Sequence, residues 1–294
     1  METGKNNAFL HEIDKNTDGY DIYFRIFHDP FSFVSNHWHT AVEIIYLLSG
    51  ELEVTLNEYT SLLKAGDFIL INSRIVHSTK SINGNESIML QLPYPFLKKC
   101  IPDISAVQLM VSSRPGHAQT ASTLVRLKEI LKSMRVLFEA GGIEDRLQFN
   151  SLLYKLLYLL YRDFRTEVLP SDYEKRSKNL YRLEPLIQYT QEHYTQRITI
   201  EEIAGIAALE PRYFCRFFKK YMGITYLEYL NEVRLSHIYH DLIATDFPLR
   251  YILELHGFTN YKLFRTLFYE KFRDTPGNLR RKKTDLSANS PFSP

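Results

Sequence analysis

Three histidines and one carboxylate in the first third of the chain have the types and spacing of a ligand-binding cluster. His37 and His39 are two residues apart, Glu43 follows four residues later, and His77 lies further along the chain. In one uninterrupted strand, residues 37, 39 and 43 would share a face, because successive side chains point to opposite sides. His77 would complete the set from a neighbouring strand. Such a set suits a divalent transition metal such as zinc, nickel, manganese or iron.

Two further interpretations of these residues need no metal. Buried polar groups can bind the hydroxyls of a small ligand whose apolar face stacks on aromatic rings, and Trp38 and Tyr46 are close to the histidines in sequence. The histidines can also be structural, with hydrogen bonds satisfied inside the fold. All three interpretations stay open. The candidate effector-binding residues are His37, Trp38, His39, Glu43, Tyr46 and His77, and the candidate metal ligands are His37, His39, Glu43 and His77.

Residues 20–92, which contain this cluster, alternate between apolar and polar positions with the period of two that is typical of strands. Turn residues such as Ser49-Gly50 separate the runs. The pattern predicts an antiparallel barrel or sandwich, whose interior contains the cluster if Val42 and Ile44 face outward. The expected strands are residues 20–27, 42–48, 51–57, 67–72 and 86–92.

The spacing of the cluster resembles both motifs of the cupin barrels. Asn72 and Arg74 stand where the second cupin motif usually has Pro and Gly. The resemblance implies a cupin-like or jelly-roll-like β-barrel at the N-terminus. A sensing barrel of this kind needs no metal.

After Gly116 the pattern changes to helical periodicity. An apolar seam with steps of 3, 4, 3 and 4 is followed by Gly141-Gly142, and a second amphipathic stretch lies at residues 153–164. The first seam either covers an open face of the barrel or forms a dimer contact, and the sequence leaves both open. The residues of the seam are Leu124, Leu127, Leu131, Met134 and Phe138.

Length and composition predict two folded domains. The chain has 294 residues, of which 45% are apolar and 24% charged, values that exclude a disordered or collagen-like protein. The formal net charge of +2 by itself indicates no polyanionic partner. Two distant cysteines and the absence of an apolar leader indicate a cytoplasmic protein without disulfides or membrane segments. We expect a sensing and dimerisation domain at residues 1–165, a linker at 166–180, an all-helical domain at 181–284 and a flexible tail at 285–294.

The helical domain contains an internal repeat. Thr199 and Glu202 form a capping-box pattern, and Pro211 opens a second helix with one apolar and one basic face. About fifty residues later, Phe264 and Phe268 repeat the apolar positions of this second helix. Two helix pairs, each with a basic face, predict two helix-turn-helix units.

At these residues the sequence resembles the AraC/XylS family of transcription regulators, from roughly Leu183 to Arg281. The resemblance implies a double helix-turn-helix domain that binds promoter DNA. Glu210 replaces a Ser that usually caps the helix, and Arg273 replaces a helix-ending Gly that Arg can substitute if φ is not positive there. The matching motifs are Ile200-Glu201-Glu202-Ile203-Ala204, Arg216-x-Phe218-Lys219-Lys220-Tyr221-x-Gly223, Tyr229-Leu230-Asn231-x-Val233-Arg234-Leu235 and Gly257-Phe258-x-Asn260.

The family resemblance also assigns the residues that contact DNA. Arg216 and Arg265 can bind guanine with two hydrogen bonds each, whereas Lys219 and Lys262 can equally bind phosphates. Cys215 offers little beyond apolar contact with a thymine methyl group. The candidate DNA-binding residues are Arg212, Cys215, Arg216, Lys219, Tyr261, Lys262, Arg265 and Thr266.

The sequence therefore predicts a non-enzymatic, α+β transcription regulator, most simply an activator. We expect its partners to be double-stranded promoter DNA, RNA polymerase, a second copy of the chain and a small-molecule effector. Carbohydrate is the effector class that we favour, because many family members respond to sugars. No cofactor is required apart from the metal considered above. Two alternatives are a cupin metalloenzyme that uses the histidine cluster, and a regulator that responds to a protein instead of a small molecule.

Overall fold

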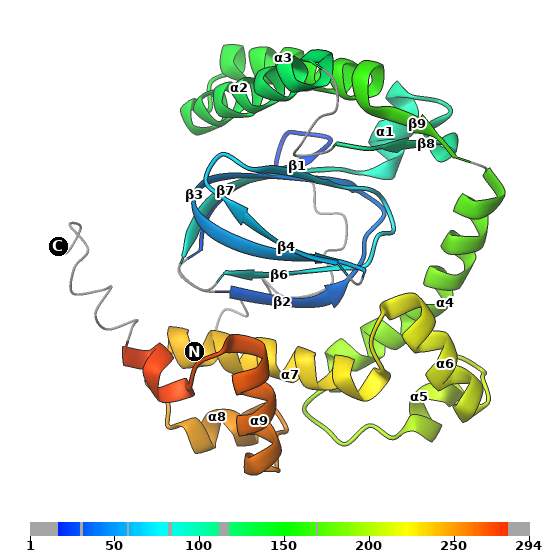
Figure 1. Ribbon diagram of the computed structural model, residues 1–294, viewed down its shortest axis with the longest axis vertical. Coiled ribbons are helices and arrows are strands. Elements are labelled where there is room, and N and C mark those ends of the chain that lie inside the picture. The colour runs from blue at the N-terminus through cyan, green and yellow to red at the C-terminus, as the bar shows by residue number, and fades with distance from the viewer. Residues whose placement is uncertain are drawn as a thin grey trace.

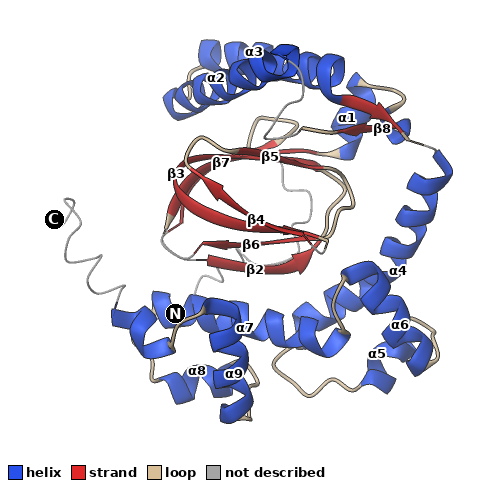
Figure 2. Ribbon diagram, viewed as in Figure 1, coloured by secondary structure: helices blue, strands red, loops and turns tan. Residues whose placement is uncertain are grey.

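A computed structural model of the protein describes most of the chain. The described residues form an N-terminal curled antiparallel sheet, a helical layer on that sheet and a C-terminal all-helical region, which confirms the predicted α+β class (Figures 1 and 2). The predicted tail at 285–294 lies outside the described residues. The described ranges are 17–29, 32–57, 59–81, 84–111, 118–168 and 170–281.

The strands within these ranges form one main sheet. Its order is β1-β7-β3-β6-β2, and β4 and β5 also pair with β3. All of these pairings are antiparallel. The strands are β1 (Tyr23–Asp29), β2 (Ser32–His37), β3 (Val42–Leu56), β4 (Tyr59–Lys64), β5 (Phe68–Ile71), β6 (His77–Ser81) and β7 (Asn85–Leu92).

The long strand β3 gives the sheet its curl. The predicted turn at Ser49-Gly50 is instead part of this continuous strand, with a register shift between Leu47 and Ser49. The part of β3 before the shift pairs with β5, the part after it pairs with β4 and β6, and β7 pairs with β3 on both sides of the shift. Gly50 has φ +75°, and a Cβ there would lie 2.1 Å from the Gly84 carbonyl oxygen. A bulge with glycine therefore bends the strand without ending it.

The two faces of β3 have different neighbours. Ile45 and Leu47 belong to a buried cluster on the inner side of the curled sheet. Val42 and Ile44 face outward, which is the condition under which the sequence places the histidine cluster inside, and they pack in a second cluster that includes α2 (Ala118–Ala140) and α3 (Ile143–Phe164). The predicted apolar seam of α2 is buried there, so it covers the sheet and is not exposed as a dimer contact (Figure 1).

Short elements connect this layer to the helical region. They are α1 (Tyr94–Cys100), the 3-10 helix η1 (Ile104–Ala106), β8 (Val107–Leu109) and β9 (Arg165–Glu167), which pairs with β8. The predicted linker at 166–180 includes the end of β9 and the first part of α4, so most of it is helical. The remaining helices are α4 (Pro170–His193), α5 (Ile200–Ile206), α6 (Pro211–Met222), α7 (Tyr226–Ala244), α8 (Leu249–Leu255) and α9 (Tyr261–Phe272).

Strand β2 and its neighbouring loop fasten the sheet to the helical region (Figure 1). The Phe33 carbonyl oxygen accepts a hydrogen bond of 2.6 Å from Ser236 Oγ on α7. Asn36 Nδ2 donates a hydrogen bond of 3.1 Å to the Met222 carbonyl oxygen at the end of α6. Trp38 is buried in the core formed by α4, α5, α6 and α7. The sheet therefore contacts both halves of the helical region.

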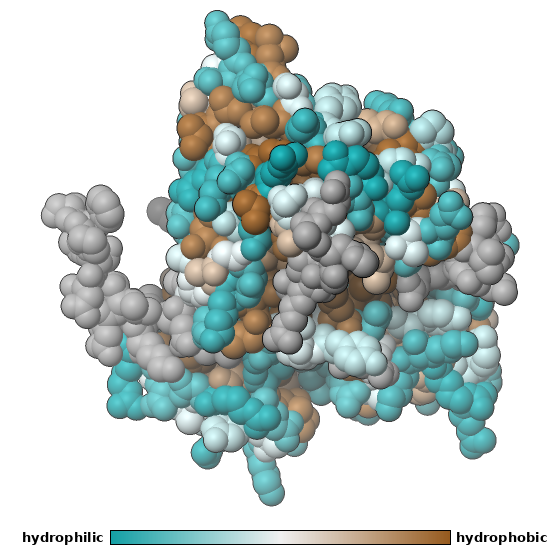
Figure 3. Space-filling view, turned by 45° about the horizontal axis from the view of Figure 1, so that its top comes forward, coloured by the Kyte–Doolittle hydropathy of each residue, from teal (hydrophilic) through white to brown (hydrophobic). Residues whose placement is uncertain are grey.

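The surface of the described residues is mixed. In Figure 3, brown apolar side chains are interspersed with teal hydrophilic ones over the upper part of the molecule. None of the helices within the described ranges is both long enough and apolar enough to span a membrane.

Candidate functional site

Local capping residues build the first helix-turn-helix unit. Thr199 Oγ1 accepts a hydrogen bond of 3.2 Å from the Glu202 backbone N–H, which confirms the predicted capping box. At the start of α6, Glu210 Oε2 accepts a hydrogen bond of 2.9 Å from the Tyr213 N–H. Glu210 thus caps the helix in place of the usual Ser, and Gly223, with φ +75°, ends it.

The second unit is built in the same way. Asn260 Oδ1 accepts a hydrogen bond of 3.0 Å from the Leu263 N–H and caps α9. Gly257, with φ +70°, makes the preceding turn. Arg273 ends α9 with φ +52°, in the left-handed conformation that usually requires glycine. The condition under which Arg can replace glycine here without strain, a φ that is not positive, is not met, so this position carries backbone strain.

The two recognition helices present basic faces to solvent. Phe214 and Phe218 of α6, like Phe264 and Phe268 of α9, are buried in their units. The two units lie at opposite ends of α7 (Figure 1). Among the described residues, no ion pair within 4.0 Å involves the basic side chains on these faces, although backbone hydrogen bonds, with a smaller contribution from nearby Arg216 for Glu210 and Lys219 for Glu228, lower the pKa of each carboxyl. The residues predicted to contact DNA are all exposed, namely Arg212, Cys215, Arg216, Lys219, Tyr261, Lys262, Arg265 and Thr266.

Exposed tyrosines adjoin both basic faces. A groove of about 540 Å³ follows α9, and Lys262, Arg265 and Tyr269 are among the residues that line it. Tyr269 is 55% exposed, and Tyr213 on α6 is 45% exposed. Neither tyrosine is among the DNA contacts predicted from the sequence. The spacing of Tyr269, four residues after Arg265 on the same helix face, was the available signal.

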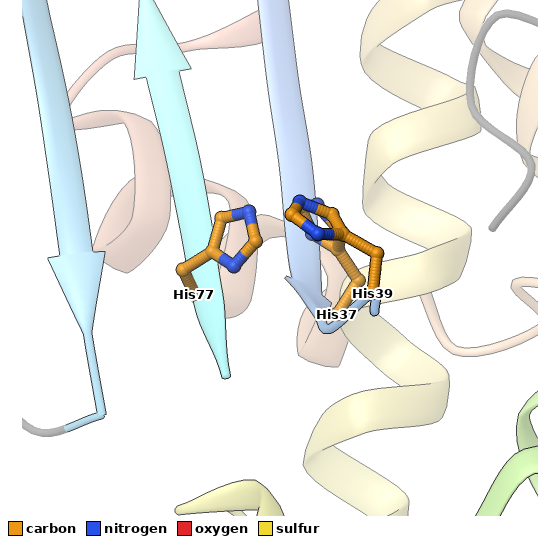
Figure 4. Close-up of side chains that lie close together, drawn as sticks. All are labelled: His37, His39 and His77. Atoms are coloured by element: carbon orange, nitrogen blue, oxygen red, sulfur yellow. The ribbon is translucent and has the colours of Figure 1, made fainter. Parts of the chain in front are cut away.

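The three histidines of the candidate ligand site lie together (Figure 4). In each of them, Nδ1 faces the carbonyl oxygen of a residue two positions away in the chain, at 2.9 Å for His37, 3.0 Å for His39 and 2.9 Å for His77. An Nδ1–H donated to a carbonyl leaves Nε2 of a neutral imidazole as an acceptor in His37 and His77, whereas His39 Nε2 lies within hydrogen-bond distance of the Glu43 carboxylate. One ring nitrogen of each histidine lies within 4.8 Å of those of the other two.

Glu43 adds a carboxylate to this cluster. Its Oε2 atom lies 3.0 Å from His39 Nε2 and accepts a hydrogen bond of 2.8 Å from Gln91 Nε2. Its Oε1 atom lies 3.9 Å from His77 Nε2. The buried His77 Nε2 atom has no hydrogen-bond partner among the described residues. The cluster thus includes an unsatisfied nitrogen directed toward a carboxylate.

Burial and charge set the protonation of the cluster. Burial alone raises the pKa of the Glu43 carboxyl, but the hydrogen bond and charge of His39, with smaller contributions from His77 and Gln91, hold this pKa well below its usual range. Burial lowers the pKa of His77 to about 4, against the opposing effect of Glu43. At neutral pH the site therefore holds an ionised carboxylate and a neutral His77, both of which can act as ligands.

The other two candidate effector residues, Trp38 and Tyr46, pack in other parts of the fold than the histidine cluster. Trp38 lies in the helical core described above, and Tyr46 faces the outer layer, with Lys132 Nζ 5.8 Å from its ring centroid. The histidine and carboxylate positions do not share one strand, because β2 ends at His37 and Glu43 lies in β3. Three separate segments therefore assemble the cluster.

Two known families match the chain. The AraC-like ligand binding domain matches residues 19–157, and a helix-turn-helix domain matches residues 203–282. The HTH-type transcriptional regulator YdeC of Bacillus subtilis (strain 168) is 22% identical over 256 residues, which cover 83% of this chain and 85% of YdeC. The HTH-type transcriptional activator RhaS of Enterobacter sp. (strain 638) is 27% identical over 59% of this chain and 62% of RhaS. The solved structure of ToxT from Vibrio cholerae has a TM-score of 0.48 and 14% identity over 89% of this chain and 98% of ToxT.

Proposed function

This chain belongs to the AraC/XylS family of DNA-binding transcriptional regulators, and from that membership we propose that it is a homodimeric activator whose curled sheet binds a small effector. The observation that supports this proposal best is the pair of recognition helices with exposed basic faces. The relatives named above are transcriptional regulators, a class that is not enzymatic. RhaS is named as an activator, and this supports the proposed sign of regulation.

We assign different roles to the basic side chains of α6. Arg216 reads a guanine through two hydrogen bonds, and Lys219 binds a phosphate. In α9, Arg265 and Lys262 have the corresponding roles. Because the units occupy opposite ends of α7, we expect α6 and α9 to enter successive major grooves, about one helical turn or roughly 34 Å apart.

Salt-dependent binding to the promoter tests these roles. We expect Lys219→Ala to weaken binding on all DNA sequences alike and to lower the salt slope by about 1, because one phosphate contact is lost. Arg216→Ala should also relax sequence preference, with a loss of about 1–3 kcal/mol on the preferred site only. Lys64→Ala, on the exposed strand β4, is the control for charge removal. If neither α6 variant differs from this control, the proposed DNA-binding face is wrong.

We propose that the effector binds at His37, His39, Glu43 and His77. Convergent imidazole and carboxylate groups can bind the hydroxyls of a carbohydrate, which is the ligand class that we favour from the family resemblance. Calorimetry with common mono-, di- and trisaccharides tests this class, with His77→Phe as the variant that removes a polar group. Absence of heat with every saccharide, together with binding of another class of metabolite, would contradict it.

A divalent transition metal is a second candidate for the same residues. The observation in its favour is that all three Nδ1 atoms face carbonyl oxygens, while the unpartnered His77 Nε2 atom faces Glu43. Nitrogen donors and a carboxylate are the ligands that such metals prefer. Elemental analysis of the purified protein tests this candidate. Stoichiometric metal that is lost in His77→Phe would support it, whereas a metal content that is the same in both proteins would contradict it.

The route from this site to the DNA-binding units follows β2. His37 and His39 belong to the ligand cluster, while Trp38 between them is buried in the core of the first unit. A ligand that binds the docked and undocked arrangements with different affinities would shift the balance between them. Footprinting of the promoter with and without each candidate ligand measures this response.

A further inference from the structure

A loop of the first helix-turn-helix unit contacts the second unit directly. Residues 194–196 lie between α4 and α5, and Tyr194 packs against the core of the first unit. In Figure 1 this loop extends past α7 toward α8 and α9. A Cβ placed on Gly257, in the turn between α8 and α9, would lie 2.1 Å from the Thr195 carbonyl oxygen. The two backbones are therefore in contact, and we call residues 194–196 the bridging loop.

Arg234 of α7 holds the bridging loop in place. Its Nε atom donates a hydrogen bond of 2.7 Å to the Tyr194 carbonyl oxygen, and its Nη2 atom donates one of 2.6 Å to the Gln196 carbonyl oxygen. The Cζ atom of the same guanidinium lies 6.0 Å from the centroid of the Phe258 ring, which belongs to the core of the second unit. A planar guanidinium carries several donors in a fixed geometry, so one side chain can bind two carbonyls at once. Arg234 thus contacts both units.

The side chain of Tyr194 continues this contact. Its hydroxyl oxygen lies 3.1 Å from His256 Nδ1, and His256 Nε2 lies 2.8 Å from Asp241 Oδ2 on α7. When the Nε2 proton is donated to the carboxylate, His256 Nδ1 can accept the hydroxyl proton of Tyr194. The Tyr194 ring is stacked on that of His237, with centroids 4.3 Å apart. His256 is 6% exposed, so these hydrogen bonds are shielded from water and the loss of one partner is costly.

Helix α7 is the other connection between the two units. Its first part, up to Val233, packs in the core of the first unit, and its second part, from Leu235 onward, packs in the core of the second. Arg234 lies at the boundary between these cores. Because long helices bend and curve, one helix alone defines the angle between two attached units poorly. A second contact away from the helix axis removes that freedom, and the bridging loop makes such a contact.

We propose that the bridging loop, held by Arg234 and His256, fixes the positions of α6 and α9 relative to each other and so determines which separation of DNA subsites the protein accepts. This inference rests on the proposed DNA-binding function. Base pairs one step apart differ by about 3.4 Å along the duplex and about 34° around it, so two rigidly held helices match only one separation. Arg234 and His256 are positioning residues, because they act through the helices that contact DNA.

Promoter duplexes with altered spacing test this proposal. Each duplex holds one binding site for a single chain, and one base pair is inserted or removed between the subsites of α6 and α9. We expect the wild-type chain to lose roughly tenfold or more in affinity on either altered duplex, which is the loss that one misplaced base contact typically causes. Arg234→Met keeps the long side chain but loses both hydrogen bonds to the bridging loop. It should lose about threefold or less, because its units can turn to follow the shifted subsites.

Two outcomes of this experiment would overturn the proposal. One is a spacing penalty in Arg234→Met that equals that of the wild type. The other is a wild-type chain that binds all three duplexes alike. Arg234→Lys, which keeps the charge and can bind one carbonyl, should recover part of the spacing penalty that Arg234→Met lacks.

Two glycine substitutions give a matched second test. Gly257→Ala places a Cβ against the bridging loop, whereas Gly223→Ala places one at the end of α6, where the nearest atom is the Asn57 carbonyl oxygen at 3.7 Å. Both residues have positive φ, +70° and +75°, so both variants carry similar backbone strain. Only Gly257→Ala should relax the spacing preference. Equal preferences in the two variants would contradict the role of the bridging loop.

Binding to a single subsite separates this inference from the proposed DNA-binding function. On a duplex that keeps only the α6 subsite, Arg234→Met and the wild type should have equal affinity and equal salt slope, because the basic face is unchanged. A weaker single-subsite affinity in Arg234→Met would show that Arg234 supports the first unit itself, and would overturn its positioning role. A wild-type chain that does not prefer its promoter over unrelated DNA would contradict the DNA-binding function. A retained promoter preference with an unchanged spacing penalty in Arg234→Met would contradict only the role of the bridging loop.

Discussion

Phe33 lies in the contact between β2 and the helical region, and its burial there allows us to predict how much docking weakens when it is replaced. Its side chain is 1% exposed, and its ring packs edge-on against Phe272 of α9 with centroids 5.7 Å apart. Lys271 Nζ lies 4.3 Å from the centroid of the same ring. Replacing a buried phenylalanine by alanine costs about 3–5 kcal/mol. At about 1.4 kcal/mol per factor of ten, docking of the sheet on the helices should weaken at least about a hundredfold in Phe33→Ala.

Trp38 provides the assay, because it is the single tryptophan of the chain and is 2% exposed within the helical core. In Phe33→Ala, we expect its fluorescence to shift to longer wavelength at urea concentrations where circular dichroism still reports native helices. Phe24→Ala is the matched control, since Phe24 is also 1% exposed but packs against Phe138 and Phe149 within the N-terminal layer. The control should lower overall stability while fluorescence and circular dichroism change together.

One outcome for Phe33→Ala would contradict the predicted docking contact. If fluorescence and circular dichroism of Phe33→Ala follow one transition with the wild-type midpoint, Phe33 does not hold the two regions together. The proposed route from the ligand cluster to the recognition helices would then lose its support. If the Trp38 fluorescence of Phe33→Ala shifts at a lower urea concentration than the circular dichroism, and its promoter affinity also no longer depends on ligand, then docking and the ligand response are coupled.

Three further substitutions have measurable consequences. Burial, with a smaller effect from a neighbouring histidine, lowers the pKa of His237 to about 4 from 6.5, so its contribution to stability is complete above pH 6.5 and is lost as the pH falls toward 4. As the pH falls from 6.5 to 4, His237→Phe should therefore lose up to about 3 kcal/mol less free energy of unfolding than the wild type, as measured by urea titrations. The same pH dependence in both proteins would contradict this role of His237. Arg273→Gly should raise the free energy of unfolding by about 1 kcal/mol, because φ is +52° there. Thermal melting measures this gain, and an unchanged melting temperature would contradict the strain at residue 273. Gly50→Ala should destabilise the protein by several kcal/mol more than Gly66→Ala, because both have positive φ but only the Cβ at residue 50 meets backbone within 4 Å; equal melting temperatures would show that the bulge adapts.

Much of the helical region was predictable from short stretches of sequence. The capping box at Thr199 and the apolar repeat at Phe214 and Phe264 involve residues three to four positions apart, and the structure confirms them. The alternation along β3 implied that the cluster lies inside if Val42 and Ile44 face outward, and the structure shows that they do face outward. Period and capping depend on backbone geometry, which a short segment carries within itself.

Other features required the folded chain. Ser49-Gly50, next to the register shift, resembles a turn in sequence, and only the pairing of β7 on both sides of the shift shows that β3 continues. The α2 seam fits both a sheet and a second helix, and Trp38 fits both a ligand pocket and a protein core. Each of these alternatives requires an apolar side chain. The neighbouring residues in the sequence therefore cannot show which surface that side chain packs against.

By itself, the sequence determined the two helix-turn-helix units, their basic faces and the α+β architecture, because these follow from local periodicity, capping and charge. The folded chain was needed to show that three segments form the histidine cluster, that Trp38 is buried in the helical core instead, and that the α2 seam packs against the sheet. These outcomes depend on which distant side chains fill the same space, and that is fixed only when the sheet curls and the helices pack on it.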